Sequence, residues 1–211
     1  MTQPTDDQLW NDGLKAKGNG RILILGCGAL AREILAITRD FDHIDLQCLP
    51  AIYHNHPEKI VPAVRKVVAE SGHYDRIFLV YADCGTGGEL QRVAKDLGIE
   101  MMPGPHCFAF FQGTDDFMSK IDEEFTSFYL TDFLVRQFDA FVWKPLGLDR
   151  HPELRDSYFG HYEKLVYQAQ IEDAALLEKA RACADRLGLA FEHRVTGYGD
   201  LKTELGKLGK D

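Results

Sequence analysis

The chain has 211 residues, of which 45% are apolar and 27% are charged, a composition that is typical of folded proteins and excludes disordered and fibrous classes. Its formal net charge of −9 would repel a phosphate backbone, so nucleic acid is not an expected partner. No apolar stretch approaches the roughly 20 residues of a membrane helix, and the first residues lack the pattern of a secretory signal. We therefore expect a cytoplasmic protein that does not bind a membrane.

The first half of the chain predicts strands and helices in alternation. Residues 1–20 are polar around Trp10 and are expected to form an N-terminal arm or a short docked helix. Apolar runs and helical spacing predict, in order, strand 21–26, helix 29–38, strand 43–49, a helix from Pro57, strand 74–81, a helix after residue 88, strand 99–102 and helix 106–111. Parallel strands need crossover helices, so this alternation predicts a largely parallel sheet covered on both faces. The expected fold class is therefore α/β, Rossmann-like and doubly wound.

The second half predicts more helix. Apolar residues at three- and four-residue spacing indicate helices at 132–138, 151–170 and 173–187, and Gly188 is placed to end the last of them. Strands are expected at 191–195 and, on a weaker pattern, at 128–130. We expect these extra C-terminal helices to flank the same sheet, so that residues 21–211 form a single α/β domain behind the arm at 1–20.

Five cysteines occur in a chain that is large enough to fold without disulfides. Cys48 and Cys183 lie inside apolar patterns and are predicted to be core residues. Cys27, Cys84 and Cys107 each follow a strand or a turn and precede a helix. Loops after parallel strands lie at one edge of a sheet, where ligands bind, so we expect these three thiols to converge there. At helix N-termini the dipole would lower the thiol pKa values and favour the thiolates.

Three thiolates with one imidazole would close a tetrahedral zinc site, and three thiolates with an open position would hold zinc with a substrate or an iron–sulfur cluster. His54, in the loop after the second strand, is the easier fourth ligand, because His106 is adjacent to Cys107; Asp83 is a further candidate. Thiolates suit both metals, so the sequence does not choose between them. We therefore predict a zinc or iron–sulfur site formed by the three loop cysteines and His54.

A glycine-rich loop, Gly85-Thr86-Gly87-Gly88, leads from the strongest strand into a helix. Exposed backbone amides at such a helix start suit an anion, so this loop is predicted to bind an anionic group of a substrate or cofactor. Gly26-Cys-Gly28 with Ala31 is a weak match to a dinucleotide fingerprint, and nucleotide binding is a lesser alternative.

A series of short motifs follows in order along the chain: Gly26-Cys-Gly-Ala-Leu-Ala-Arg-Glu33, His54 with Pro57 and Ile60, Asp83-Cys-Gly-Thr-Gly-Gly88, Pro103-Gly-Pro-His-Cys107 and Phe128-Tyr-Leu-Thr-Asp132. The series resembles the DUF1638 family from about Arg21 to about Gly199. The resemblance implies a cysteine-bearing α/β domain with cysteines at the positions of Cys27, Cys84 and Cys107. It also implies a methylated-amine, one-carbon methyl-transfer setting, because the family is often found in company with corrinoid-dependent methyltransferases.

Two positions depart from the family pattern. Many members carry His-Asp-Cys where this chain has His106 directly before Cys107, and members often have an apolar residue where this chain has Asp83. The resemblance therefore leaves the fourth ligand open among His54, Asp83 and His106.

Three functions remain open at this point. In the first, the metal acts on a small-molecule substrate while Asp83 or His106 moves protons, as in a transferase or a lyase. In the second, the protein is a non-catalytic metal or iron–sulfur accessory of a corrinoid methyltransferase system. In the third, no metal is present, Cys84 is a nucleophile and His106 is its base. The exposed helices would permit a homodimer, and no sequence signature specifies one.

Overall fold

The computed structural model describes residues 3–16, 18 and 20–210. The chain forms two compact units, the first comprising Met1–Cys107 with Leu201–Asp211 and the second comprising Phe108–Asp200. The division expected from the sequence, an arm at 1–20 and one domain at 21–211, does not coincide with these units. Whether residues 21–211 fold as one independent domain stays a prediction.

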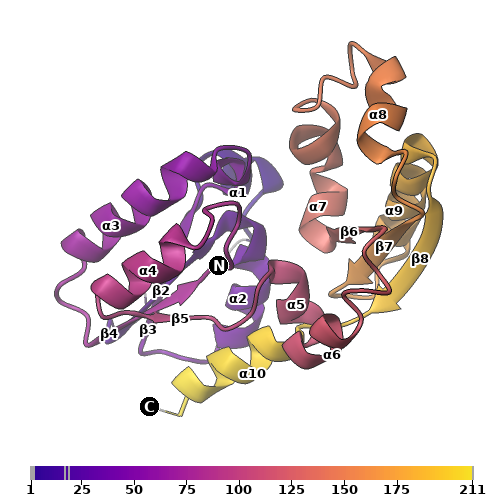
Figure 1. Cartoon of the computed structure of the whole chain (residues 1–211). Coiled ribbons are helices and arrows are strands. Elements are labelled where there is room, and N and C mark those ends of the chain that lie inside the picture. The colour runs from indigo at the N-terminus through magenta and orange to yellow at the C-terminus, as the bar shows by residue number, and fades with distance from the viewer. Residues whose placement is uncertain (1–2, 17, 19, 211) are drawn as a thin grey trace. The chain divides into compact units, whose positions relative to one another are not determined.

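The first unit is built on a five-stranded sheet (Figure 1). Its strands are β1 (Leu14–Ala16), β2 (Ile22–Cys27), β3 (Ile44–Leu49), β4 (Arg76–Val80) and β5 (Glu100–Met101), in the spatial order β1-β3-β2-β4-β5. All neighbouring pairs are parallel except β1 with β3. Every residue of the central strand β2 is buried, as expected for a strand covered on both faces. Part of the predicted N-terminal arm is thus an edge strand of this sheet.

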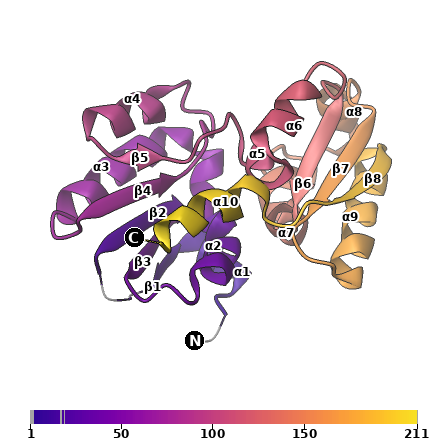
Figure 2. The same ribbon diagram turned by 90° about the horizontal axis from the view of Figure 1, so that it is seen from below.

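Helices cover both faces of this sheet. They are α1 (Asp6–Asn11), α2 (Ala31–Thr38), α3 (Ile60–Glu70), α4 (Glu89–Asp96) and the greater part of α10 (Gly199–Leu208). Helices α3 and α4 lie on one face and α2 lies on the other (Figure 2). The chain passes from β2 to β3 through α2, and it returns from β3 past β2 to β4 through α3. Right-handed crossovers that run in opposite directions along a sheet place their helices on opposite faces. The predicted α/β class with a mainly parallel sheet is confirmed.

The second unit contains a separate sheet of three parallel strands. These are β6 (Ser127–Thr131), β7 (Lys164–Ala169) and β8 (Ala190–Val195), in the order β6-β7-β8. Its helices are α6 (Thr114–Ser119), α7 (Asp132–Arg136), α8 (Arg155–Phe159) and α9 (Ala174–Leu187), with most of α5 (Cys107–Gln112). Asp173 caps α9 by accepting hydrogen bonds from the N–H groups of Ala175 and Leu176, and the helix ends at Gly188 as predicted, in the left-handed conformation.

The helix predicted over 151–170 is wrong. Only Pro152–Leu154 and Arg155–Phe159 are helical, and β7 follows as the central strand of the second sheet. The last five residues of β7 are buried, and Leu165, Val166 and Tyr167 at its centre form a short run of large hydrophobic side chains. The periodicity of such a run does not distinguish a buried strand from a buried helix.

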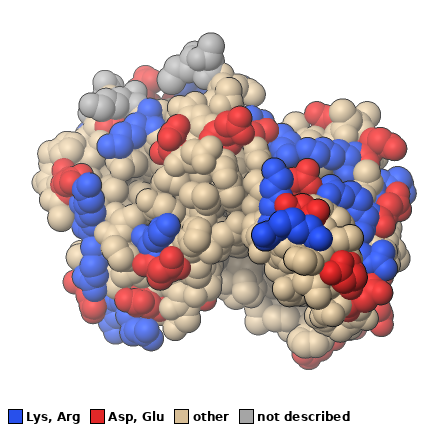
Figure 3. All heavy atoms as spheres, turned by 90° about the horizontal axis from the view of Figure 1, so that it is seen from above, with Lys and Arg blue, Asp and Glu red and all other residues tan. Residues whose placement is uncertain are grey.

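Exposed charges stand beside charges of opposite sign on the face drawn in Figure 3. Ion pairs among exposed residues of the second unit include Arg155 with Asp156 (2.7 Å) and Arg186 with Asp139 (2.8 Å). Such exposed pairs contribute little to stability. Within the described ranges, none of the helices has both the length and the apolar character needed to cross a lipid bilayer.

Candidate functional site

Two of the three loop cysteines follow the strands at which the order of the first sheet reverses. Cys27 is the last residue of β2 and is buried, and Cys84 lies in the loop after β4 and is half-buried. The carboxyl ends of β2 and β4 flank the position at which open α/β sheets bind their ligands. Cys107, also half-buried, is the first residue of α5.

Electrostatic coupling relates Cys84 to both of the other thiols. Burial is the main cause of the raised pKa of Cys84, and the nearness of Cys107 and of Cys27 raises it further, so both lie within electrostatic range of it. Cys84 is thus the thiol that is related to both of the others.

Burial keeps two of these thiols protonated. It raises the pKa of Cys27 and raises that of Cys84 well above its ordinary value. The expectation that helix N-termini favour the thiolates is therefore wrong for both. A helix dipole acts over the first turn, whereas α2 begins only at Ala31, after a 3₁₀ turn, and α4 begins only at Glu89.

The backbone at Cys84 is in the left-handed region, with φ of +48°. It is the only non-glycine residue with positive φ in the ranges that the structure describes. This conformation costs an L-residue roughly 1–2 kcal/mol, and glycine adopts it freely. Such a residue is found where the surrounding structure imposes the conformation, often at functional sites.

Asp83 holds the glycine-rich loop. Its Oδ1 accepts hydrogen bonds from the Gly88 N–H (2.6 Å) and the Thr86 hydroxyl (3.2 Å), and its Oδ2 accepts one from the Gly87 N–H (3.2 Å). These bonds lower the pKa of Asp83, the Gly88 bond most, so the carboxylate is ionised. An anion bound by this loop would have to displace that carboxylate from two of the amides. The structure thus gives Asp83 a loop-holding role; anion binding by Gly85–Gly88 and proton transfer by Asp83 stay predictions.

The two histidines of the predicted site are both exposed. His54 lies in the 3₁₀ helix Ala51–Asn55, which follows β3, and loss of solvent among its neighbours lowers its pKa. Its imidazole is therefore neutral at pH 7, the form that binds metals. His106 directly precedes α5.

The donor types fit a soft metal, because thiols suit zinc and iron–sulfur clusters. Among the residues that the structure describes, however, no three or more His, Cys, Asp and Glu side chains form a group that could hold a metal ion. The three loops would have to close around Cys84 to complete such a site.

Sequence reasoning missed Tyr81, which directly follows β4 and is 2% exposed. Gly26 pairs with Val80 in the parallel register, so the next residues, Cys27 and Tyr81, point together to the opposite face of the sheet. The Tyr81 hydroxyl completes no hydrogen bond of ordinary geometry, yet it lies close enough to Cys27 to lower the pKa of that thiol. A tyrosine at the end of an apolar strand is typical of a core position. The sequence alone does not show how β2 and β4 pair, so it does not place Tyr81 beside Cys27.

Cys48 faces the other side of the sheet. A Cβ added to its register partner Gly26 would lie 3.6 Å from the Cys48 sulfur and 2.9 Å from Cδ1 of Ile34 in α2. Cys48 is 3% exposed, and Cys183, in α9, is equally buried. The prediction that these two cysteines belong to the core is confirmed.

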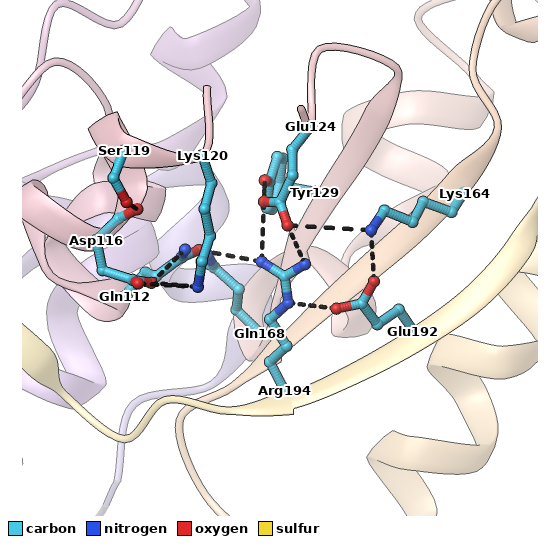
Figure 4. A network of polar contacts seen from close by, with 10 residues as sticks. All are labelled: Gln112, Asp116, Ser119, Lys120, Glu124, Tyr129, Lys164, Gln168, Glu192 and Arg194. Carbon is cyan, nitrogen blue, oxygen red and sulfur yellow. Dashed lines mark hydrogen bonds and ion pairs between the residues drawn. The ribbon is translucent and has the colours of Figure 1, made fainter. Parts of the chain in front are cut away.

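A polar network covers one face of the second sheet (Figure 4). Arg194 on β8 donates to both oxygens of Glu124 and, at 2.5 Å, to Glu192; Lys164 on β7 donates to Glu192 at 2.6 Å. The Tyr129 hydroxyl donates to Glu124. Hydrogen bonds from Arg194 are the largest cause of the lowered pKa values of both glutamates. Cations and carboxylates are paired throughout, so the network fixes structure and leaves no charge for a ligand.

Asp132 joins the carboxyl ends of β6 and β7. It is 1% exposed, and its carboxylate accepts from the Tyr167 hydroxyl (2.8 Å) and from the N–H groups of Gln170 (3.1 Å) and Ile171 (3.2 Å). These bonds give the motif that ends in Asp132 a structural role.

The model of a family described as protein of unknown function (DUF1638) matches residues 48–205, which is more than half of the chain. The matched range contains Cys84 and Cys107 and begins after Cys27, so it is shorter than the resemblance expected from the sequence. No curated protein and no solved structure is significantly similar to the chain. The chain therefore belongs to the DUF1638 family of proteins of unknown function.

Proposed function

We propose that this protein binds a soft metal, as a zinc ion or an iron–sulfur cluster, through the thiols of Cys27, Cys84 and Cys107. The observation that carries the proposal is the position of Cys27 and Cys84 at the carboxyl ends of β2 and β4, where the strand order of the first sheet reverses. Ligands of open α/β sheets bind at this edge.

The state of the thiols supports the proposal. Burial disfavours a lone thiolate at Cys27 and at Cys84. A metal cation between them would stabilise the thiolates, because its positive charge offsets their negative charge. Binding would then release thiol protons to solvent. When bound, such a metal supplies either Lewis-acid or electron-transfer chemistry.

The remaining ligand position is assigned to His54 or left to a substrate. The neutral imidazole of His54 is in the form that binds metals. Asp83 fits less well as a ligand, because its carboxylate already holds the loop that carries Cys84. His106 remains the alternative, as the neighbour of Cys107.

Our first hypothesis is that the metal site catalyses a reaction of a small-molecule substrate, in the one-carbon setting that the resemblance implies. A non-catalytic accessory of a corrinoid methyltransferase system is the second. The metal-free reading, with Cys84 as nucleophile and His106 as base, is less well supported, because only the thiolate is nucleophilic and burial raises the pKa of Cys84.

The test is the metal and acid-labile sulfide content, with a visible spectrum, of protein purified without oxygen. We expect near-stoichiometric zinc or iron in the wild type, and its loss in Cys27→Ala, Cys84→Ala and Cys107→Ala. Cys183→Ala is the matched control, since it removes a buried thiol of the second unit and should keep the metal. A wild type that lacks metal as purified and takes up neither zinc nor iron on reconstitution would overturn the proposal.

A further inference from the structure

We infer that Tyr81 is a positioning residue of the thiol site, whose hydroxyl donates a hydrogen bond to the Cys27 sulfur when that sulfur is a metal ligand. The inference rests on the proposed function and adds to it a residue outside the ligand set.

The first observation is the unsatisfied hydroxyl. Tyr81 is 2% exposed, and its Oη has no hydrogen-bond partner of ordinary geometry among the described residues. Buried hydroxyls are almost always hydrogen-bonded, because an unpaired one loses its hydration without compensation. An exception at the carboxyl edge of a parallel sheet points to an acceptor that the protein provides only in another state.

The second observation is direction. The register that pairs Gly26 with Val80 places Cys27 and Tyr81 on the same face of adjacent strands. Cys48, on the opposite face beneath α2, is thereby excluded as the acceptor. The Cys27 side chain lies within hydrogen-bonding reach of the Tyr81 hydroxyl.

The chemistry completes the argument. A thiol sulfur is a weak acceptor, whereas a metal-bound thiolate carries negative charge and is a good one. A phenol carries one O–H donor near neutral pH, so Tyr81 can donate to such a sulfur. Partners of this kind orient metal ligands, and their removal weakens metal binding about 10- to 100-fold.

The experiment compares wild type, Tyr81→Phe and Tyr167→Phe, with cobalt(II) alone as the probe. Tyr167 is the matched control, a buried tyrosine of the second unit whose hydroxyl donates to Asp132. The readouts are cobalt affinity by competition with a chelator, the sulfur-to-cobalt charge-transfer absorption, and the melting temperature of the metal-free protein.

Tyr81→Phe should bind cobalt about 10-fold more weakly than wild type and shift the charge-transfer band, while its metal-free form melts no lower than wild type. Tyr167→Phe should lower the melting temperature and leave cobalt affinity unchanged. Equal affinity and equal spectra for wild type and Tyr81→Phe would overturn the inference and leave the proposed function standing. Lower stability of metal-free Tyr81→Phe would assign the residue to the fold and also overturn it. A wild type that binds no cobalt through sulfur would overturn both.

Discussion

At the scale of single residues, Cys84 combines a coupled thiol with a backbone conformation that suits glycine. Cys84→Gly and Cys84→Ala both remove the thiol, but only glycine relieves the strain. Relief of roughly 1–2 kcal/mol outweighs the roughly 0.4–1 kcal/mol by which glycine favours the unfolded chain. We expect Cys84→Gly to be more stable than Cys84→Ala by about 0.5–1 kcal/mol in urea unfolding of the metal-free proteins. The reverse order would show that the loop leaves this conformation when the thiol is absent.

Asp83 makes a pH-dependent contribution to the same loop. Its folded-state pKa is lowered, first by the Gly88 N–H, so the contribution is present above the unfolded value of about 3.9 and is lost as pH falls through the lower folded value. We expect wild type to exceed Asp83→Asn in stability at pH 7. The difference should shrink once the pH falls below about 4. Urea unfolding of both proteins at pH 7 and pH 3 tests this; a difference that grows in acid contradicts it.

At the scale of the elements, Arg194 and its two glutamates hold β8 to β7 and to the segment before β6. Arg194 is 19% exposed and Glu124 is 11% exposed, so removal of the guanidinium leaves carboxylates that water reaches poorly. We expect Arg194→Met to destabilise the second unit by about 3 kcal/mol. Lys120→Met is the control: it breaks the exposed pair with Asp116 in the same network and should cost under about 1 kcal/mol.

Thermal unfolding followed by circular dichroism measures both changes. Equal and small effects of the two substitutions would mean that water reaches the Arg194 network freely. A double variant, Arg194→Met with Glu124→Gln, should recover part of the loss, because it removes one of the stranded charges.

The elements that sequence predicts well are those with one clear period or a strong terminator. β2 is a buried apolar strand and β4 carries the apolar run 77–80, while Gly188 ends α9 in the conformation that glycine favours. β7 was not predicted, because its short hydrophobic run follows a short helix without a clear break in pattern. The site was reachable in part: strand ends located Cys27 and Cys84, whereas burial of their thiols and the role of Asp83 depend on side-chain packing.

At the scale of the whole molecule, the chain carries two sheets, one mainly parallel and one parallel throughout, where the sequence predicted one. In both sheets, helices connect successive strands, and polar residues follow the strand ends. These polar residues differ in whether they find hydrogen-bond partners within the protein. Asp132 of the second sheet has all its partners within the protein, whereas the Tyr81 hydroxyl of the first does not. The proposed site lies in the first unit, which contains all three loop cysteines.

Metal binding to folded protein alone should stabilise that unit, and the chain offers a probe for it. Trp10 and Trp143 are the two tryptophans, and Trp143→Phe leaves Trp10 as the single reporter. Trp10 lies on α1, which packs against the 3₁₀ turns that follow Cys27 and contain His54. Zinc at about 100 times its Kd should raise the unfolding free energy reported by Trp10 by about 2.7 kcal/mol.

The stabilisation should disappear on addition of a chelator and in a Cys84→Ala background. It should grow between pH 6 and pH 8, because zinc must displace protons from thiols whose pKa values are raised. Stabilisation that survives Cys84→Ala would place the metal elsewhere. Stabilisation that falls as pH rises would show that thiols are not the ligands, since a site that releases protons binds more tightly when protons are scarce.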